Sequence, residues 1–203
     1  MENILIPDIN YDFYNMDTDC LISVFNICNN DKDKIGDIKP QDILSFRGKK
    51  ELKIQGKNSK FSKSMQDKIK SSIKKLKGEK FIDCFEFINS YLIIHNIKHR
   101  NTYIAPKKIL SLNPKKELWG KIFALEIYKR GSSQIQIKKL FKNVHIAPSL
   151  KPYKIRDNFE ENMDNLCLKK IINSWHYKDI DEANFVKKDW LHEWFKLSVI
   201  IKA

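Results

Sequence analysis

The clustered lysines are the residues in this sequence whose type and spacing most clearly predict binding. Between Arg47 and Lys80 the chain holds thirteen Lys or Arg and three acidic residues, a net charge of +10 out of +13 for the 203 residues. Clustered cations gain affinity for polyanions by releasing the counterions that condense on phosphates. The cluster therefore favours nucleic acid as a partner, and an acidic membrane surface is the competing polyanion.

The lysines surround an apolar stripe with helical spacing. The stripe consists of Met65, Ile69, Ile73 and Leu76. It predicts a helix that begins with a capping box at Ser64–Asp67 and stops at Gly78. Small and hydrogen-bonding side chains lie opposite the stripe and cations lie on both flanks, which is the layout that a helix needs in the major groove of DNA.

This layout predicts two sets of contact residues. The side chains expected to read bases are Gln66, Lys70, Ser71 and Lys74. Those expected to bind phosphates are Arg47, Lys49, Lys50, Lys57, Lys60, Lys63, Lys68 and Lys75. A solvated lysine face with no partner is the plainer interpretation, but the charge cluster coincides with the third helix of a helix-turn-helix pattern, which favours binding.

Catalytic and metal-binding patterns are weak in comparison. The pair His95 and His99 has ligand-like spacing, but no paired cysteines precede it, and the four cysteines sit inside apolar patterns that suggest reduced core thiols. A nuclease site built from Asp42, Glu51 and Lys53 would use a triplet that arises often in a chain with 31% charged residues. With six glycines and no glycine-rich phosphate loop, the sequence predicts no catalytic residue, metal or cofactor, and so not an enzyme.

The apolar periodicity of residues 1–103 predicts three helices followed by a β-hairpin. A first helix follows Asp17 or Thr18, a second covers 40–46, and the lysine-rich helix is the third. The segments 80–88 and 90–98 are rich in aromatic and β-branched residues, which is typical of paired strands. Helix, helix, helix, hairpin is the order of a winged helix.

Residues 104–203 show a similar pattern after a linker at 99–116. Helices are expected from Trp119 to Gly131, after Ser133 and after Pro152, with β-like stretches at 170–180 and 194–202. When the sequence is shifted by 94 residues, many apolar positions of the first half align with apolar positions of the second half. We therefore expect an α+β, mainly helical chain of two tandem winged-helix units, 1–103 and 104–203; a single helical domain with a mixed sheet stays open as the alternative.

The third helix of the second unit differs in charge from that of the first. Where the first unit has Asp67, Lys70, Ser71 and Lys74, the second has Asp157, Glu160, Glu161 and Asp164. Carboxylates repel phosphate, so we expect these four residues to bind a cationic partner, either a second copy of the chain in a homodimer or a basic protein. A plain solvated acidic face is the alternative.

The order of two winged-helix units and one local run carry a resemblance to a known family. The run DILSFRGKKELKIQGKNSKFSKSMQDKIKSSIKKL, followed by an aromatic strand, resembles plasmid replication initiators of the tandem winged-helix type and their relatives on mobile elements. The architectural resemblance covers most of the chain. It implies a protein that binds repeated origin sequences without being an enzyme, through the third helix of each unit and basic wing residues. The positions that it carries over are Gln66, Lys70, Ser71 and Lys74.

Together these features predict a non-enzymatic, sequence-specific duplex DNA-binding protein that acts as a replication initiator or a transcriptional regulator. An interaction protein of a phage or mobile element, which binds RNA or blocks the nucleic-acid channel of another machine, stays open as the alternative. No stretch approaches about 18 apolar residues and early acids replace a basic leader, so we expect a cytoplasmic protein with no membrane partner.

Overall fold

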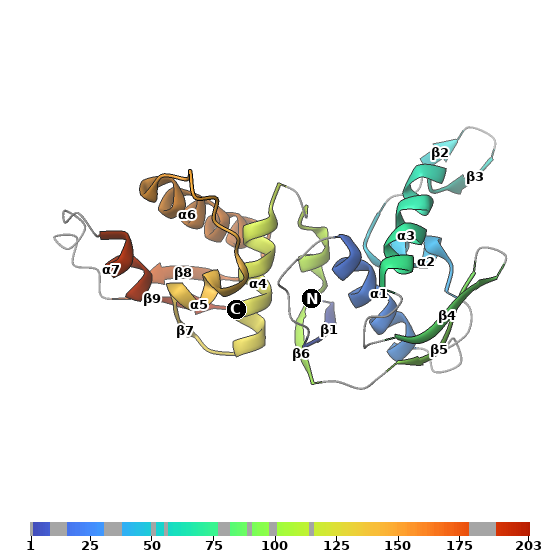
Figure 1. Ribbon diagram of the computed structural model, residues 1–203, viewed down its shortest axis with the longest axis horizontal. Helices are drawn as coiled ribbons and strands as arrows, with labels where there is room; N and C mark the ends of the chain where they lie inside the picture. The colour runs from blue at the N-terminus through green and yellow to red at the C-terminus, as the bar shows by residue number, and fades with distance from the viewer. Residues whose placement is uncertain are drawn as a thin grey trace. The chain divides into compact units, whose positions relative to one another are not determined.

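The computed structural model describes residues 2–8, 16–30, 38–49, 52–54, 57–76, 82–88, 91–97, 101–113, 116–178 and 190–203. These residues form an α+β, mainly helical chain that divides into two compact units, whose elements are labelled in Figure 1. The N-terminal unit comprises Asn3–Asp8 and Asn15–Tyr103, and the C-terminal unit comprises Met1–Glu2, Ile9–Tyr14 and Ile104–Ala203. Among the described helices, none is long and apolar enough to cross a membrane.

The N-terminal unit contains the three predicted helices and the predicted hairpin. In chain order its elements are β1 (Asn3–Pro7), α1 (Met16–Asn30), α2 (Pro40–Phe46), β2 (Leu52–Ile54), β3 (Lys57–Lys60), α3 (Lys63–Leu76), β4 (Ile82–Ile88) and β5 (Tyr91–Ile97). Strands β4 and β5 pair antiparallel, with Phe85 opposite Ile94. Strand β1 pairs with β6 (Thr102–Pro106), whose first residues belong to this unit.

Helix α1 forms the centre of the N-terminal unit. Its predicted apolar positions are all buried, namely Leu21, Val24, Phe25 and Cys28. It also holds β1 through the buried amide of Asn26, which accepts a hydrogen bond from the Leu5 N–H at 2.8 Å and donates to the Leu5 carbonyl at 2.7 Å. Both backbone groups of Leu5 are satisfied in this way, so a short strand is fixed to the helix without a wide sheet.

Helix α3 begins two residues earlier than the capping box at Ser64 predicted. The hydroxyl of Ser62 accepts a hydrogen bond from the Met65 N–H at 3.3 Å, which is the N-cap arrangement. Ile69 and Ile73 are buried, as the apolar stripe predicted. The predicted end at Gly78 lies outside the described residues.

A second correction concerns the segment between α2 and α3. The predicted order of three helices and one hairpin included no strand there, whereas the structure has the antiparallel hairpin β2–β3, with Leu52 opposite Lys60. Short polar strands such as KNSK lack the apolar alternation that normally identifies a strand, which is why the pattern missed them. The N-terminal unit therefore has two hairpins, one before and one after the lysine-rich helix.

The C-terminal unit is built from helices around a three-stranded antiparallel sheet. Its elements are η2 (Lys107–Ser111), α4 (Leu118–Arg130), β7 (Gln134–Gln136), α5 (Ile137–Leu140), η3 (Phe141–Asn143), α6 (Pro152–Leu168), β8 (Ser174–Tyr177), α7 (Trp190–Lys196) and β9 (Ser198–Lys202). The sheet order is β7-β9-β8. The predicted linker at 99–116 contains β6 and η2, and β7 lies where Ser133 was expected to cap a helix.

Aromatic rings fill the core of the C-terminal unit. The Phe159 ring lies 5.4 Å from Phe123, 5.6 Å from Trp175 and 5.4 Å from Trp194, in edge-to-face arrangements. The predicted apolar positions of α6 are all buried, namely Ile155, Phe159, Met163 and Leu166. Helix α4 ends as predicted at Gly131, whose positive φ of 59° is the left-handed conformation that favours glycine.

Candidate nucleic-acid interface

The candidate interface is the solvent side of α3, which we call the lysine surface. Its exposed residues are Lys63, Ser64, Asp67, Lys68 and Ser71. The opposite side of the helix carries the buried residues Ile69, Ser72 and Ile73. Burial on one side fixes the rotation of the helix about its axis, so the cationic side faces water because the apolar side cannot.

The predicted base-reading residues have different environments. Ser71 is exposed and Lys70 is half-buried, while Lys74 lies in the last turns of α3 with a side chain outside the described set. The amide of Gln66 is occupied within the unit: it accepts from the Gln41 amide at 3.0 Å and donates to the Phe61 carbonyl at 2.9 Å. Gln66 thus joins α2 to the start of α3 instead of facing a groove.

Arg47 departs most clearly from its predicted role as a phosphate contact. Its guanidinium donates to the carboxylate of Asp19 on α1 at 2.7 Å, with side chains 3% and 0% exposed. A charge that leaves water needs a partner of opposite sign, and Asp19 supplies it. Arg47 therefore ties the end of α2 to α1, and phosphate cannot reach it in this structure.

The other predicted phosphate contacts lie on the lysine surface or close to it in the sequence. Lys49 is exposed just after Gly48, whose φ of 68° ends α2, and Lys63 and Lys68 are exposed on α3. Lys57 and Lys60 lie on β3 and Lys75 on α3, where the structure describes the backbone. Lys50 lies outside the described residues.

The lysines of β2–β3 place a basic hairpin before α3. The described residues of β4–β5, the hairpin after α3, contain no lysine or arginine. The resemblance to initiators implied basic wing residues after the third helix. In the strands that the structure describes, the lysines lie on the hairpin before that helix.

The acidic residues of α6 mostly have partners inside the C-terminal unit. The carboxylate of Glu160 accepts from the Tyr177 hydroxyl at 2.8 Å, and that of Asp164 accepts from the Trp175 indole N–H at 2.8 Å. These bonds attach α6 to β8. Asp157 lies 3.9 Å from the Lys154 ammonium and 3.8 Å from the Arg156 guanidinium. Binding of a cationic partner by Asp157, Glu160, Glu161 and Asp164 stays a prediction, and of the four Glu161 is the exposed acid with no such intramolecular bond among the described residues.

The contacts between α6 and β8 change the pKa of Tyr177. Burial, together with the hydrogen bond to the Glu160 carboxylate, raises the pKa of its hydroxyl well above the usual value. Tyr177 therefore stays neutral at physiological pH. It acts as the donor to Glu160 and as the acceptor for the indole of Trp194 at 3.2 Å.

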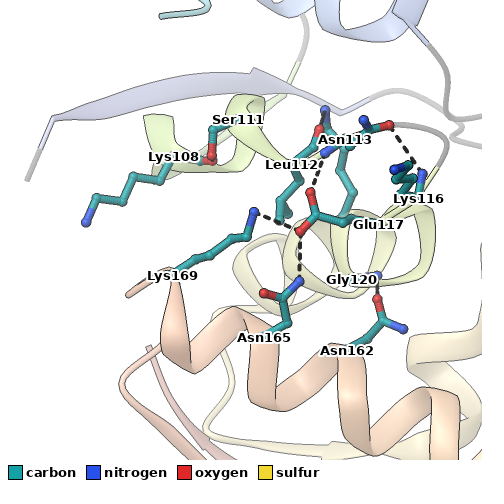
Figure 2. A network of polar contacts seen from close by, with 11 residues as sticks. Lys108, Ser111, Leu112, Asn113, Lys116, Glu117, Gly120, Asn162, Asn165 and Lys169 are labelled. Carbon is teal, nitrogen blue, oxygen red and sulfur yellow. Dashed lines mark hydrogen bonds and ion pairs between the residues drawn. The ribbon is translucent and has the colours of Figure 1, made fainter.

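A hollow of about 410 Å³ lies between the start of α4 and α6, and it was not predicted from the sequence. Its lining residues are Lys116, Glu117, Leu118, Trp119, Asn158, Glu161, Asn162 and Asn165. The sequence feature that could have indicated this hollow is the spacing of Asn158, Asn162 and Asn165 at i, i+4 and i+7 of α6, because asparagine is a poor helix former. Figure 2 shows how two of them serve α4: Asn162 accepts from the Gly120 N–H at 2.9 Å, and Asn165 donates to Glu117 at 2.8 Å.

Glu117 is the most heavily bonded carboxylate beside the hollow. It accepts from the Asn113 N–H at 2.7 Å, from Asn165 at 2.8 Å and from the Lys169 ammonium at 2.8 Å (Figure 2). Burial alone would raise its pKa, but these hydrogen bonds and the charge of Lys169 outweigh it and lower the pKa to about 2. Glu117 is therefore ionised at any physiological pH and its oxygens are occupied.

Among the described residues, no three His, Cys, Asp or Glu side chains are grouped as metal ligands. Of the predicted histidine pair, His99 lies outside the described residues. Comparison with protein-family models, with curated proteins and with solved structures finds no match to this chain.

Proposed function

We propose that this protein is a non-enzymatic nucleic-acid-binding protein that contacts duplex DNA through the lysine surface of α3. The observation that carries the proposal is the two-sided character of this helix: Ile69 and Ile73 are buried on one side, and Lys63 and Lys68 are exposed with the small residue Ser71 on the other. Lysines on the flanks of this side can bind phosphates, and a small central residue allows close approach to base edges.

The proposal extends to a pair of winged-helix units. In the C-terminal unit, helix α4, strand β7, helices α5 and α6, and strands β8 and β9 follow in this order, and the first strand lies beside the last in the sheet β7-β9-β8. This is the element order of a winged helix with α7 inserted before the final strand. In the N-terminal unit three helices precede the hairpin β4–β5, which supports the same architecture.

The role that fits this combination is that of a replication initiator or transcriptional regulator. Both roles need a sequence-specific duplex binder with no catalytic group. The concentration of +10 of the +13 charges in residues 47–80 supports a dominant contribution of the N-terminal unit to affinity.

The test is the salt dependence of DNA binding by paired variants of the full chain. Each phosphate contact on B-DNA contributes about −0.9 to the slope of log affinity against log salt, so we expect a slope on the order of −4 to −6 for the natural chain. Replacing Lys63 and Lys68 by alanine should weaken binding to all sequences and make the slope less steep by about 1.8. Lys108 and Lys202 are exposed in the C-terminal unit and provide the charge-matched control.

Sequence preference is tested at Ser71. Its replacement by alanine should change the relative affinities of different duplexes by about 1–3 kcal/mol while the salt slope stays constant. A slope near zero, or equal losses for the Lys63/Lys68 and Lys108/Lys202 variants, would contradict the proposal. If the protein binds RNA more tightly than any duplex DNA, the lysine surface binds RNA, as in the alternative function.

A further inference from the structure

We infer that the hollow between α4 and α6 binds a single unpaired nucleobase that carries an exocyclic amine, adenine or cytosine. The inference rests on the proposed function in one respect, namely that the partner is a nucleic acid. It adds a second site, in the C-terminal unit, with a chemistry different from that of the lysine surface.

Most of the polar groups around the hollow already have structural roles. Asn162 caps α4 through the Gly120 N–H, and its own amide donates to the Asn158 carbonyl at 2.7 Å. The Glu117 carboxylate is saturated by Asn113, Asn165 and Lys169. These groups form the frame of the hollow and are not free to bind a ligand.

Three side chains at the hollow have no such role. Within the part of the chain that the structure describes, the side-chain amide of Asn158, the carboxylate of Glu161 and the ammonium of Lys116 form no hydrogen bond or ion pair. Asn158 and Glu161 project from neighbouring turns of α6 and Lys116 precedes α4. Asparagine is an unfavourable residue in a helix interior, so the position of Asn158 has no structural explanation here.

The balance of donors and acceptors selects the ligand class. A phosphate only accepts hydrogen bonds and would face the Glu161 carboxylate, and a guanidinium only donates and would face the Asn158 NH₂ and Lys116. Adenine and cytosine offer both kinds of group side by side, because their exocyclic amine lies beside a ring nitrogen that accepts, whereas on the pairing edge of guanine the amine lies beside a second donor. Asparagine pairs with the amine and ring nitrogen of adenine through two hydrogen bonds, and a glutamate accepts from the amine of cytosine.

The wall and the size of the hollow fit the same ligand. Trp119 lines it and is held in place by edge-to-face contacts with Phe123 at 6.3 Å and Phe141 at 5.4 Å between ring centroids. Bases stack on such fixed aromatic side chains in single-strand binding proteins. The volume of about 410 Å³ lies within the range of roughly 300–1,000 Å³ that is usual for small-ligand sites. These edges stay accessible in the major groove of a duplex, but stacking covers the faces of the paired bases, so a base that stacks on Trp119 must come from an unpaired strand.

The direct test is a titration of the ¹⁵N-labelled full chain with nucleosides, followed by NMR. Millimolar adenosine or cytidine should shift the indole signal of Trp119 and the side-chain amide signal of Asn158, and uridine, which has no exocyclic amine, should shift neither. Free nucleosides and a base within a strand share the same chemistry. A short oligo(dA) that shifts the same signals at a much lower concentration identifies the strand as the source.

Variants then separate this site from general electrostatics. Asn158→Ala and Glu161→Gln should each weaken oligo(dA) binding about ten-fold. Asp157→Asn removes the same charge as Glu161→Gln from the same helix but outside the hollow, and it should leave oligo(dA) binding unchanged. Equal shifts with uridine, no shift with any nucleoside, or equal effects of Asp157→Asn and Glu161→Gln would overturn the inference.

The experiments distinguish failure of this inference from failure of the proposed function. Nucleoside titration does not involve the lysine surface, so a normal salt slope on duplex DNA with no nucleoside shift would overturn the second site alone. Nucleoside shifts in a chain whose duplex binding shows no salt dependence would instead contradict the role of the lysine surface.

Discussion

At the scale of single residues, the pair of Arg47 and Asp19 shows how burial changes the role of a cation. Replacing Arg47 by methionine removes the guanidinium that forms the ion pair with the buried Asp19 carboxylate, which should lower the stability of the N-terminal unit by about 3–5 kcal/mol. Urea unfolding followed by far-ultraviolet circular dichroism measures the loss. The affinity of the folded variant for DNA, and its salt slope, should stay close to those of the natural chain.

The double variant Asp19→Asn with Arg47→Met is the control, because it removes both charges and should recover much of the lost stability. The opposite outcome is an Arg47→Met variant with unchanged stability and a salt slope that is less steep by about 0.9. It would show that Arg47 contacts a phosphate.

Glu117 gives the C-terminal unit a dependence on pH in the acid range. Its pKa falls from 4.5 to about 2 on folding, so its contribution is complete above about pH 4.5 and is lost as the pH falls toward 2. Glu117→Gln should lower the stability by about 1–2 kcal/mol at pH 7 and by progressively less below pH 4.5. Urea unfolding followed by tryptophan fluorescence at several pH values measures the difference. A constant difference from pH 7 to pH 2 would rule out this role of the ionised carboxylate.

At the scale of elements, Asn162 connects two helices that are far apart in the sequence. It accepts from the Gly120 N–H in the first turn of α4, and a Cβ at position 120 would lie 3.0 Å from its oxygen. Asn162→Ala should therefore destabilise the C-terminal unit by about 1 kcal/mol through the loss of a helix cap. Gly120→Ala should have a similar effect, because it displaces the same amide.

The two changes should not add, because both remove one hydrogen bond. Additive losses in the double variant, measured by urea unfolding, would show that Gly120 and Asn162 act separately. Asn162→Asp keeps an acceptor for Gly120 and is the matched control for lost packing.

At the scale of the whole molecule, the tryptophans allow the two units to be followed separately. Trp119, Trp175, Trp190 and Trp194 all belong to the C-terminal unit. Residues 104–203 expressed alone should therefore give a cooperative transition with blue-shifted fluorescence, because the core around Phe159 is contained in them. A red-shifted spectrum without cooperativity would indicate that this core needs the rest of the chain.

The full chain provides the complementary measurement. Arg47→Met should shift the transition seen by circular dichroism and leave the tryptophan transition in place, whereas Glu117→Gln should shift the tryptophan transition. Coincident shifts by both probes in both variants would mean that the units unfold as one.

The sequence by itself determined the three helices of the N-terminal unit and the hairpin β4–β5 that follows them, whereas α7 was missed, because its last residues lie in the stretch 194–202 that was expected to be a strand. Helix α3 was predictable because the spacing of Ile69 and Ile73 and the lysines around them are local properties, which need only one buried side. The hairpin β2–β3 was not predictable, because β3 (KNSK) is entirely polar and the three residues of β2 (LKI) are too few to establish an alternation of apolar and polar types.

Only the tertiary structure decided which polar side chains are available to a partner. Arg47 meets Asp19 across 28 positions of the chain, Gln66 meets Gln41 across 25, and Asn165 meets Glu117 across 48. Composition and spacing cannot distinguish an exposed lysine from a buried arginine, because burial depends on which helices pack together. The charge cluster was therefore visible in the sequence. The internal bonds that occupy Arg47 and Gln66, and the hollow beside Asn158, arise from contacts between residues distant in the chain.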